Sequence, residues 1–499
     1  MHSNSNATGS SDLSGACCLT LLSLLGSSQV TFPGSQAYEF SRSSFFSQQE
    51  AQLQPRCVVA PTGVEDVSTI LQSLTSIGTS LPEGERSVCD FAIRSGGHTP
   101  FAGAASIDGG ITIDLQGLKA IEVSSDRATV SVGPGATWGE VYSFLDPLQL
   151  TVAGGRVAQV GVGGLTTGGG ISFVSPRYGW TCDTVQNFEV VLANGSIIHA
   201  NADEHPDLLG ALRGGSNNFG IVTRADLTAI EQGPVWGGNV YYALDTIDQQ
   251  LQATAQFSDP ETYDDYASLI VSLSFSGAQG AAIVNSIVYT RAEENPPAFQ
   301  PFTEIASLSS TLRLANMSSI TTELGSYSPN GHRQLFLETT FASTQSMLNA
   351  TYRHWNTSLA AIREVAGIVW SVSLEPLPPS IYARASPENA LGLSGTSGTL
   401  VVALLSATWN DATDDAAVAQ VAREMFAAVE DDAHRLEAYH PFVYLNYAAP
   451  WQDPIASYGP ESVERLRRVA WDVDPRGVFT ANVPGGFKIP GEQSSEPIS

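Results

Sequence analysis

Two glycine-rich segments constrain this chain more than any other feature of its sequence. The first, Arg94-Ser-Gly-Gly-His98, directly follows the apolar run Phe91-Ala-Ile93. The second begins at Gly161-Val-Gly-Gly164 and continues to Gly168-Gly-Gly170. Glycine lets a backbone approach a ligand closely, and free N–H groups in such turns suit a pyrophosphate. We therefore expect both segments to face one ligand, with a nucleophilic ring nitrogen of His98 beside it.

Length and charge limit the classes of protein to which the chain can belong. With 499 residues it exceeds one ordinary hydrophobic core, so we expect at least two domains. No apolar stretch approaches the ~18–20 residues that cross a bilayer. The net charge of −27 argues against partners such as nucleic acids and anionic membrane surfaces, which require basic patches. Because Lys119 and Lys488 are the only lysines, backbone dipoles and a few arginines must hold any bound phosphate.

Four of the five cysteines lie near the N-terminus, and no pair has the C-x-x-C spacing of a metal site. This distribution predicts a disulfide between the N-terminal segment and the first domain. One of Cys17 and Cys18 would pair with Cys57 or Cys89. Reduced, buried thiols are the alternative.

Residues 15–26 have the length of a signal-peptide core, but no basic residue precedes them. Their leucines fit one face of a helix equally well, so we expect an N-terminal helix of the mature fold. The chain is expected to be secreted or to lie in the secretory pathway or vacuole. The cytoplasm is the alternative, because no clear signal peptide is present. N-glycosylation triplets begin at Asn6, Asn194, Asn316, Asn349 and Asn356.

The first half of the chain alternates short strands with few helices. We expect helices at 64–77 and at 138–145, the second of them capped by Thr137. A hairpin is expected over 188–199, with Asn194-Gly195 as a two-residue turn. The expected strands are 57–61, 91–93, 111–115, 121–123 and 128–132.

Composition changes near Gly233-Pro234, and longer β-type runs follow. Helices are expected at 342–365 and 416–436, and a further helix at 461–471 lies in the C-terminal segment. The pattern predicts an α+β domain in which helices cover one face of a sheet. Its expected strands are 266–275, 283–289, 368–374 and 399–405.

Taken together, these motifs resemble the vanillyl-alcohol-oxidase superfamily of flavoproteins, with its PCMH-type FAD-binding domain. The closest resemblance is to its berberine-bridge-enzyme-like branch in fungi and plants. It extends from about Cys57 to Phe479 and includes both glycine-rich segments. Its further marks are Arg177-Tyr-Gly179, Asp183, Leu212-Arg-Gly-Gly-Ser-Asn-Asn-Phe-Gly-Ile-Val-Thr223, Tyr444-Leu-Asn-Tyr447, Asp474-Pro475 and Val478-Phe479.

The resemblance implies an α+β fold with two parts. A two-subdomain FAD-binding domain would occupy residues 52–232, and a substrate-binding domain with an antiparallel sheet covered by helices would occupy 233–450. Residues 1–51 would form an N-terminal segment packed on the FAD-binding domain. Residues 451–499 would return to that domain.

In this family a histidine at the position of His98 is bonded to the 8α carbon of FAD. Many relatives add a second bond from a cysteine at the position of Val157, where this chain has no nucleophile. The resemblance therefore implies a single covalent attachment, and Cys182 is expected to pack as a core thiol. The resemblance also implies that Val160 lets oxygen reach the flavin, because relatives with valine at this position resemble oxidases. The other expected FAD contacts are Arg94, Ser95, Gly96, Gly97, Thr99, Gly161, Gly163, Gly164, Thr167, Gly168, Gly169, Asp183, Gly220, Ile221, Val222 and Asn446.

The expected catalytic residues are Tyr447, Asn446 and Glu375. Tyr447 is the first candidate for the base, and a nearby cation or hydrogen bond would have to favour its phenolate. Glu375 is the second candidate, because an apolar strand can tune a carboxylate. A half-buried strand tyrosine and a salt-bridged edge glutamate are the structural alternatives. The resemblance implies that Arg213 to Asn218 form a glycine-lined wall for the nucleotide half of FAD. Asp183 and Arg177 either touch the cofactor or fix that loop.

We therefore expect an FAD-dependent oxidase that passes hydride from a small organic substrate to flavin and electrons from flavin to O2, giving H2O2. The substrate is an alcohol, a sugar end group or a secondary metabolite. Two alternatives stay open. One is an oxidative or redox-neutral cyclase of secondary metabolism, and the other is a flavin-carrying protein that only binds ligands. We expect a monomer without a metal ion.

Overall fold

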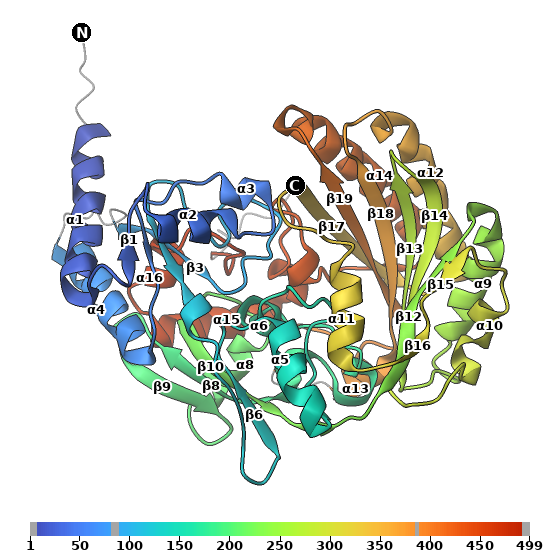
Figure 1. Cartoon of the computed structure of the whole chain (residues 1–499), viewed down its shortest axis with the longest axis horizontal. Helices are drawn as coiled ribbons and strands as arrows, with labels where there is room; N and C mark the ends of the chain where they lie inside the picture. Colours follow the sequence, from blue (N-terminus) through green and yellow to red (C-terminus); the bar gives the residue numbers. More distant parts are fainter. Residues whose placement is uncertain (1–6, 81–88, 385–388, 492–499) are drawn as a thin grey trace.

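The computed structural model describes residues 7–80, 89–384 and 389–491 (Figure 1). The N-terminal part is a small sheet with strand order β1-β2-β4-β3, in which β2 and β3 both run parallel to β4. Helix α1 packs against α4 beside this sheet. The elements are α1 (Ala7–Leu25), β1 (Val30–Thr31), α2 (Gln36–Ser43), α3 (Gln48–Ala51), β2 (Cys57–Val59), α4 (Val64–Ser80), β3 (Phe91–Arg94) and β4 (Ile111–Asp114).

Two disulfides join the N-terminal helix to this sheet region. Cys17 is bonded to Cys89, and Cys18 is bonded to Cys57. The predicted link between the N-terminal segment and the first domain is therefore confirmed, and both neighbouring cysteines of the helix take part in it. Each bridge closes a long loop, of 72 and 39 residues in sequence separation, and so restricts the unfolded chain.

A second sheet, with strand order β5-β6-β10-β8-β9, forms the next layer. The capping box between Thr137 and Glu140 starts α5 at the expected residue. The predicted hairpin forms between β8 and β9, but its turn differs from the expectation. Leu192 N–H donates to Ser196 O, and only Gly195 has a positive φ, of 82°. A two-residue turn of type I′ needs positive φ at both central positions and one of type II′ needs it at the first, so neither forms at Asn194-Gly195. The elements are β5 (Ile121–Val123), β6 (Thr129–Val132), α5 (Trp138–Leu145), β8 (Val185–Val191), β9 (Ile197–Asn201), α8 (Pro206–Leu212) and β10 (Ile221–Thr228).

A large antiparallel sheet forms the second half of the molecule. Helices α9 (Ile247–Phe257), α12 (Gln345–Ile362) and α14 (Asp415–Arg435) cover one of its faces, on the right in Figure 1. Strand β17, which sequence reasoning did not identify, pairs with β19 along its whole length. The strands are β12 (Val235–Tyr242), β13 (Ala267–Ser276), β14 (Gly280–Tyr289), β15 (Ser309–Ser310), β16 (Arg313–Ala315), β17 (Arg333–Ala342), β18 (Val369–Leu377), β19 (Leu400–Trp409) and β20 (Tyr439–His440).

The last segment of the chain packs against the first half. Helix α15 (Pro460–Val473) contacts α8, and Val478, Phe479 and Val483 belong to the apolar core beneath β2–β4. None of the described helices has the length and apolar character needed to cross a membrane. The remaining elements are β7 (Leu150–Thr151), α6 (Val162–Thr167), α7 (Ser175–Tyr178), β11 (Ile230–Glu231), α10 (Gln300–Thr303), α11 (Met317–Gly325), α13 (Pro379–Arg384) and α16 (Val478–Ala481).

These layers confirm the α+β class and the helix-covered antiparallel sheet. The face of the large sheet opposite α9, α12 and α14 turns toward the glycine-rich segments of the first half, and we call it the open face. The candidate site lies between these two walls.

Candidate functional site

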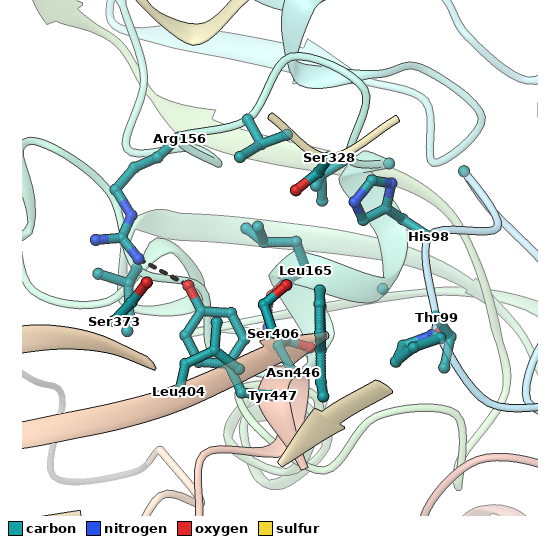
Figure 2. A pocket seen from close by; sticks show the side chains of 18 of the residues that line it. His98, Thr99, Arg156, Leu165, Ser328, Ser373, Leu404, Ser406, Asn446 and Tyr447 are labelled. Carbon is teal, nitrogen blue, oxygen red and sulfur yellow. Dashed lines mark hydrogen bonds between the residues drawn. The ribbon is translucent and has the colours of Figure 1, made fainter. Parts of the chain in front are cut away.

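A cavity of about 1050 Å³ separates the glycine-rich segments from the open face of the large sheet. The first half of the chain contributes Ser95 to Phe101 and most of the stretch from Val160 to Thr167. The second half contributes alternate residues of the sheet strands and Tyr444 to Ala448. Figure 2 shows His98 and Thr99 on one side, with Ser373, Leu404, Ser406 and Tyr447 on another.

The glycines of the two segments are required because the segments touch each other. A Cβ on Gly96 would lie 2.6 Å from both Cα and N of Gly161, and a Cβ on Gly161 would lie 2.3 Å from Gly96 N. Ser95 fixes the contact, since its hydroxyl donates to Pro134 O at 2.5 Å and accepts from Gly163 N at 3.0 Å. Gly96 and Gly161 are therefore needed for contact between the two segments of the protein, and not for contact with a ligand.

The loop that follows Ser95 leaves its amides available to a ligand. Among the described residues, the backbone N–H groups of Gly96, Gly97, His98 and Thr99 have no hydrogen-bond acceptor, and all four residues line the cavity. Gly164 also lines it, and a Cβ there would meet no protein atom within 4 Å. Consecutive free amides form an anion-binding concavity. This arrangement fits the pyrophosphate of FAD.

His98 is held as a neutral imidazole at the edge of the cavity. Its ring stacks on Phe46 with centroids 3.9 Å apart and an interplanar angle of 19°. Desolvation by the surrounding protein lowers the pKa of His98 to about 4. Phe46 comes from the loop before α3, and sequence reasoning gave it no role. No local pattern in the sequence links that loop to His98.

Four of the expected FAD contacts lie outside the cavity lining. The guanidinium of Arg94 points into the N-terminal segment, where it donates to Ser41 O at 2.6 Å and to Ser44 Oγ at 2.8 Å. Asp183 accepts from Trp180 N and Asn389 Nδ2, so it fixes its own loop. The other two are Gly168 and Gly169. These residues support the walls of the cavity from behind.

The remaining expected contacts line the cavity together. Val157 and Val160 lie in it with the first glycine segment, and Cys182 is a buried free thiol outside it. Arg177 also lies outside and donates to Thr290 Oγ1. The other members of the lining are Ser95, Gly96, Gly97, Thr99, Gly161, Gly163, Gly164, Thr167, Gly220, Ile221 and Val222.

Three polar side chains from distant parts of the chain meet at the inner end of the cavity. Arg156 donates to Glu375 Oε2 at 2.5 Å and to Tyr447 Oη at 2.8 Å, and Tyr447 Oη lies 3.2 Å from Glu375 Oε1. The contact between Arg156 and Tyr447 is the dashed line in Figure 2. We call these three residues the proton cluster. Sequence reasoning named Tyr447 and Glu375 but not Arg156. The one feature of the sequence that could have indicated Arg156 is its positive charge within an apolar stretch.

Burial determines which member of the proton cluster carries the negative charge. Desolvation, reinforced by the Glu375 carboxylate, raises the pKa of Tyr447 well above its ordinary range despite Arg156. Desolvation opposes the charge on Arg156, but the Glu375 carboxylate raises its pKa overall. The arrangement therefore favours a neutral phenol donating to an ionised Glu375 that is paired with Arg156. Glu375 forms a salt bridge with Arg156. Its strand, β18, is an interior strand of the sheet, since it lies between β13 and β19.

Asn446 and Tyr444 connect the proton cluster to the second glycine segment. Asn446 Nδ2 donates to Leu165 O and to Tyr444 Oη, each at 3.0 Å. Tyr444 Oη in turn accepts from the amides of Gly170 and Ile171 at 3.1 Å. A Cβ on Gly168 would lie 2.2 Å from Asn446 Oδ1. Gly168 is thus needed to admit Asn446.

Comparisons with known proteins agree with this geometry. Residues 55–201 match the protein family described as FAD binding domain. The FAD-dependent monooxygenase CTB5 of Cercospora beticola is 36% identical over 500 residues, covering 98% of this chain and 94% of that protein. A protein named oligopeptidase PhomG′, from Diaporthe leptostromiformis, is 42% identical over 479 residues. That match covers 94% of this chain, which spans 37% of the Diaporthe protein's length. The solved structure of BBE-like 1 from Physcomitrella patens superposes with a TM-score of 0.76 at 20% identity, covering 95% of this chain and 99% of that one.

Proposed function

The chain belongs to the berberine-bridge-enzyme-like family of FAD-linked oxidoreductases, and from this premise we propose that it is an oxidase. Its substrate is a small organic molecule with an O–H or N–H group next to an oxidisable C–H bond. FAD, when bound, takes the hydride from that carbon and is reoxidised by O2, which gives H2O2. The observation that carries the proposal is the buried proton cluster facing the cavity.

The proton cluster removes the substrate proton. The Tyr447 hydroxyl accepts that proton at Oη while its own proton moves to Glu375 Oε1, 3.2 Å away. Arg156 stabilises the carboxylate before the transfer and keeps the phenol oriented through its 2.8 Å contact. In this scheme Glu375 is the resting base and Tyr447 relays the proton. That assignment replaces the phenolate considered from the sequence, because a buried phenol beside a carboxylate keeps its proton.

We further propose that His98 holds FAD through one covalent bond to the 8α carbon. A neutral imidazole has the free ring nitrogen that this bond requires, and the low pKa of about 4 supports its availability at neutral pH. Val157, which lines the same cavity, offers no second nucleophile. The test is acid precipitation of the purified protein. Flavin should stay in the pellet and appear on a peptide that contains His98, and free flavin in the supernatant would disprove the bond.

Val160 lies on the cavity surface and supports reaction with O2. The resemblance assigns oxygen access to a small side chain at this position. Val160→Ile should slow reoxidation of the reduced protein by air without slowing anaerobic reduction. Equal reoxidation rates for both proteins would remove Val160 from the proposal.

Anaerobic mixing tests the reaction itself. A substrate should bleach the visible flavin band, and admission of air should restore the band with one H2O2 per turnover. Product without bleaching would indicate a redox-neutral cyclase. Because CTB5 is named a monooxygenase, the reaction is repeated under ¹⁸O2. Label in the product would overturn the oxidase in favour of oxygen insertion.

We also propose an oxidising compartment and a monomer. Two disulfides support passage through the secretory pathway, since such bonds are rare in the cytosol. Asn194, Asn316 and Asn356 are exposed and therefore accessible for glycosylation, whereas Asn6 lies outside the described residues. Endoglycosidase treatment of the native protein should lower its mass, and light scattering should give the mass of one chain.

A further inference from the structure

The open face of the large sheet carries a regular array of serine hydroxyls. On β13 and β18, Ser272 faces Ser373 and Ser274 faces Ser371 in direct register. In both pairs the two hydroxyl oxygens are 2.8 Å apart. Ser286 on β14 and Ser406 on β19 extend the array to the neighbouring strands. We call these six residues the serine wall, and Figure 2 shows Ser373 and Ser406 directed at the cavity.

The cavity beside the serine wall has no net charge to offer a ligand. Of all the Asp, Glu, Lys and Arg residues in the described ranges, only Arg156 and Glu375 line it, and they neutralise each other. His98 is neutral above a pKa of about 4. A carboxylate or ammonium group bound against the serine wall would lose its hydration without finding a counter-ion there. The serine wall therefore favours a neutral ligand.

Two of the side-chain amides that line the cavity are already engaged by protein partners. Asn239 donates to Glu323 Oε1 at 2.7 Å and accepts from Ser286, and Asn446 donates to Leu165 O and Tyr444. In each serine pair one hydroxyl donates to the other, which leaves one free donor per pair. The wall thus offers single hydrogen bonds in place of the bidentate contacts that adjacent hydroxyls of a sugar can use.

The geometry of the wall suits a broad, flat ligand. Hydroxyls on one strand repeat about every 7 Å, and those on neighbouring strands lie about 5 Å apart. Apolar side chains, including Ile270, Val284 and Leu404, occupy the same sheet face. Small serines leave room for a planar molecule to lie against the sheet, with its edge oxygens over the hydroxyls and its rings over the apolar atoms.

We infer that the serine wall binds a neutral, planar, polyhydroxylated aromatic compound as the substrate of this enzyme. The claim that this ligand is the substrate rests on the proposed oxidase function, but the claim about binding does not. Charged aromatic acids and oligosaccharides are the two classes that the wall excludes.

The test is a binding titration of the FAD-loaded protein, read from the shift of its visible flavin band. The probes are naphthalene-2,7-diol, naphthalene-2-carboxylate and cellotriose, none of which absorbs in that band. The diol should saturate the shift, the carboxylate should bind at least ten times more weakly, and cellotriose should cause no shift. Tighter binding of either the carboxylate or cellotriose than of the diol would overturn the inference.

A paired variant assigns the binding to the wall. Ser274→Val combined with Ser371→Val removes both hydroxyls of one pair, so neither is left without its partner and the sheet keeps β-branched residues. The dissociation constant of the diol should rise about tenfold. Ser309→Val, an exposed position on β15 of the same sheet and outside the cavity, is the matched control. Unchanged diol binding in the paired variant, with an unchanged melting temperature, would refute the role of the wall.

The outcome can be separated from failure of the oxidase proposal. If cellotriose bleaches the flavin anaerobically, the oxidase proposal is supported and the inference of an aromatic substrate is wrong. If the diol binds through the serine wall but no hydroxylated aromatic reduces the flavin, the inference about binding is supported and the oxidase proposal is wrong.

Discussion

The two walls of the cavity are built by opposite means. On the FAD side, Gly96 and Gly161 meet backbone to backbone, and no side chain fits between them. On the sheet side, Ser272 and Ser373 stand on a regular ladder whose backbone hydrogen bonds are independent of the side chains. The first wall therefore tolerates almost no substitution, whereas the second can change its chemistry without changing the fold.

The largest effect should come from the proton cluster, which both walls enclose. Glu375→Gln removes the carboxylate that takes up the proton, so we expect kcat/KM to fall by about 10²- to 10⁴-fold. Glu430→Gln, on the helix α14 that covers the opposite face of the sheet, is the control and should leave the rate unchanged. A rate within a factor of three of the native enzyme would assign the base elsewhere.

Arg156→Met should change the pH dependence of the same reaction. Without the guanidinium, the buried carboxylate has no cation partner and takes up a proton more readily. Activity should then appear only at higher pH, with the acid limb of the kcat/KM profile displaced upward. Arg156→Lys should restore part of the original profile. An unchanged acid limb in Arg156→Met, with lower activity at every pH, would indicate a purely structural role.

Gly96→Ala should break the wall on the FAD side. The added methyl group would lie only 2.6 Å from Cα and N of Gly161, and overpacking of this kind costs about 3 kcal/mol. We expect a lower melting temperature and loss of bound FAD, measured by thermal unfolding and by the visible flavin absorbance. Gly233→Ala, where a Cβ meets nothing within 4 Å, should unfold like the native protein. Equal stability of the two variants would contradict the backbone contact.

Glu50→Gln should flatten the pH dependence of stability. Glu50 is fully buried in α3, and desolvation raises its pKa from 4.5 to about 7. The folded protein therefore binds a proton that the unfolded chain releases, so stability falls by about 3 kcal/mol as the pH rises from 4.5 to 7. Denaturant unfolding across this range measures the slope. Glu65→Gln, on an exposed residue of α4, should keep the native slope, and an identical slope in Glu50→Gln would rule out Glu50 as its source.

The smallest effect is expected on the sheet side. Ser272→Val combined with Ser373→Val replaces both members of a hydrogen-bonded pair, a change that is nearly neutral. The free energy of unfolding should change by less than about 1 kcal/mol. If this variant is destabilised as strongly as Gly96→Ala, the contrast between the two walls does not hold.

Local sequence patterns predicted much of the fold. The strand before Arg94, the helix capped by Thr137 and the helix over residues 415–435 all follow from spacing within a few turns or strand residues. The strand β17 was missed although all ten of its residues pair with β19, near one edge of the large sheet. Its residues are buried on both faces, so they show no alternation of apolar and polar side chains.

Within the candidate site, the residues that the sequence revealed are those tied to a local motif. His98 follows its glycines directly, and Tyr447 belongs to a short motif near the end of the chain. Arg156 escaped notice because its partners are 219 and 291 residues away. Phe46 escaped for the same reason, since nothing near it in sequence indicates a stack with His98.

The sequence by itself determined the FAD side of this protein, because glycine turns, caps and strand periods are properties of neighbouring residues. It determined the identity of His98 and the absence of a nucleophile at Val157. Only the tertiary structure decided what the glycines are for, since Gly96 and Gly161 make room for each other. It also decided that Arg156, Glu375 and Tyr447 form one cluster and that six serines form one wall. Those contacts depend on strand register and domain packing, which sequence spacing does not encode.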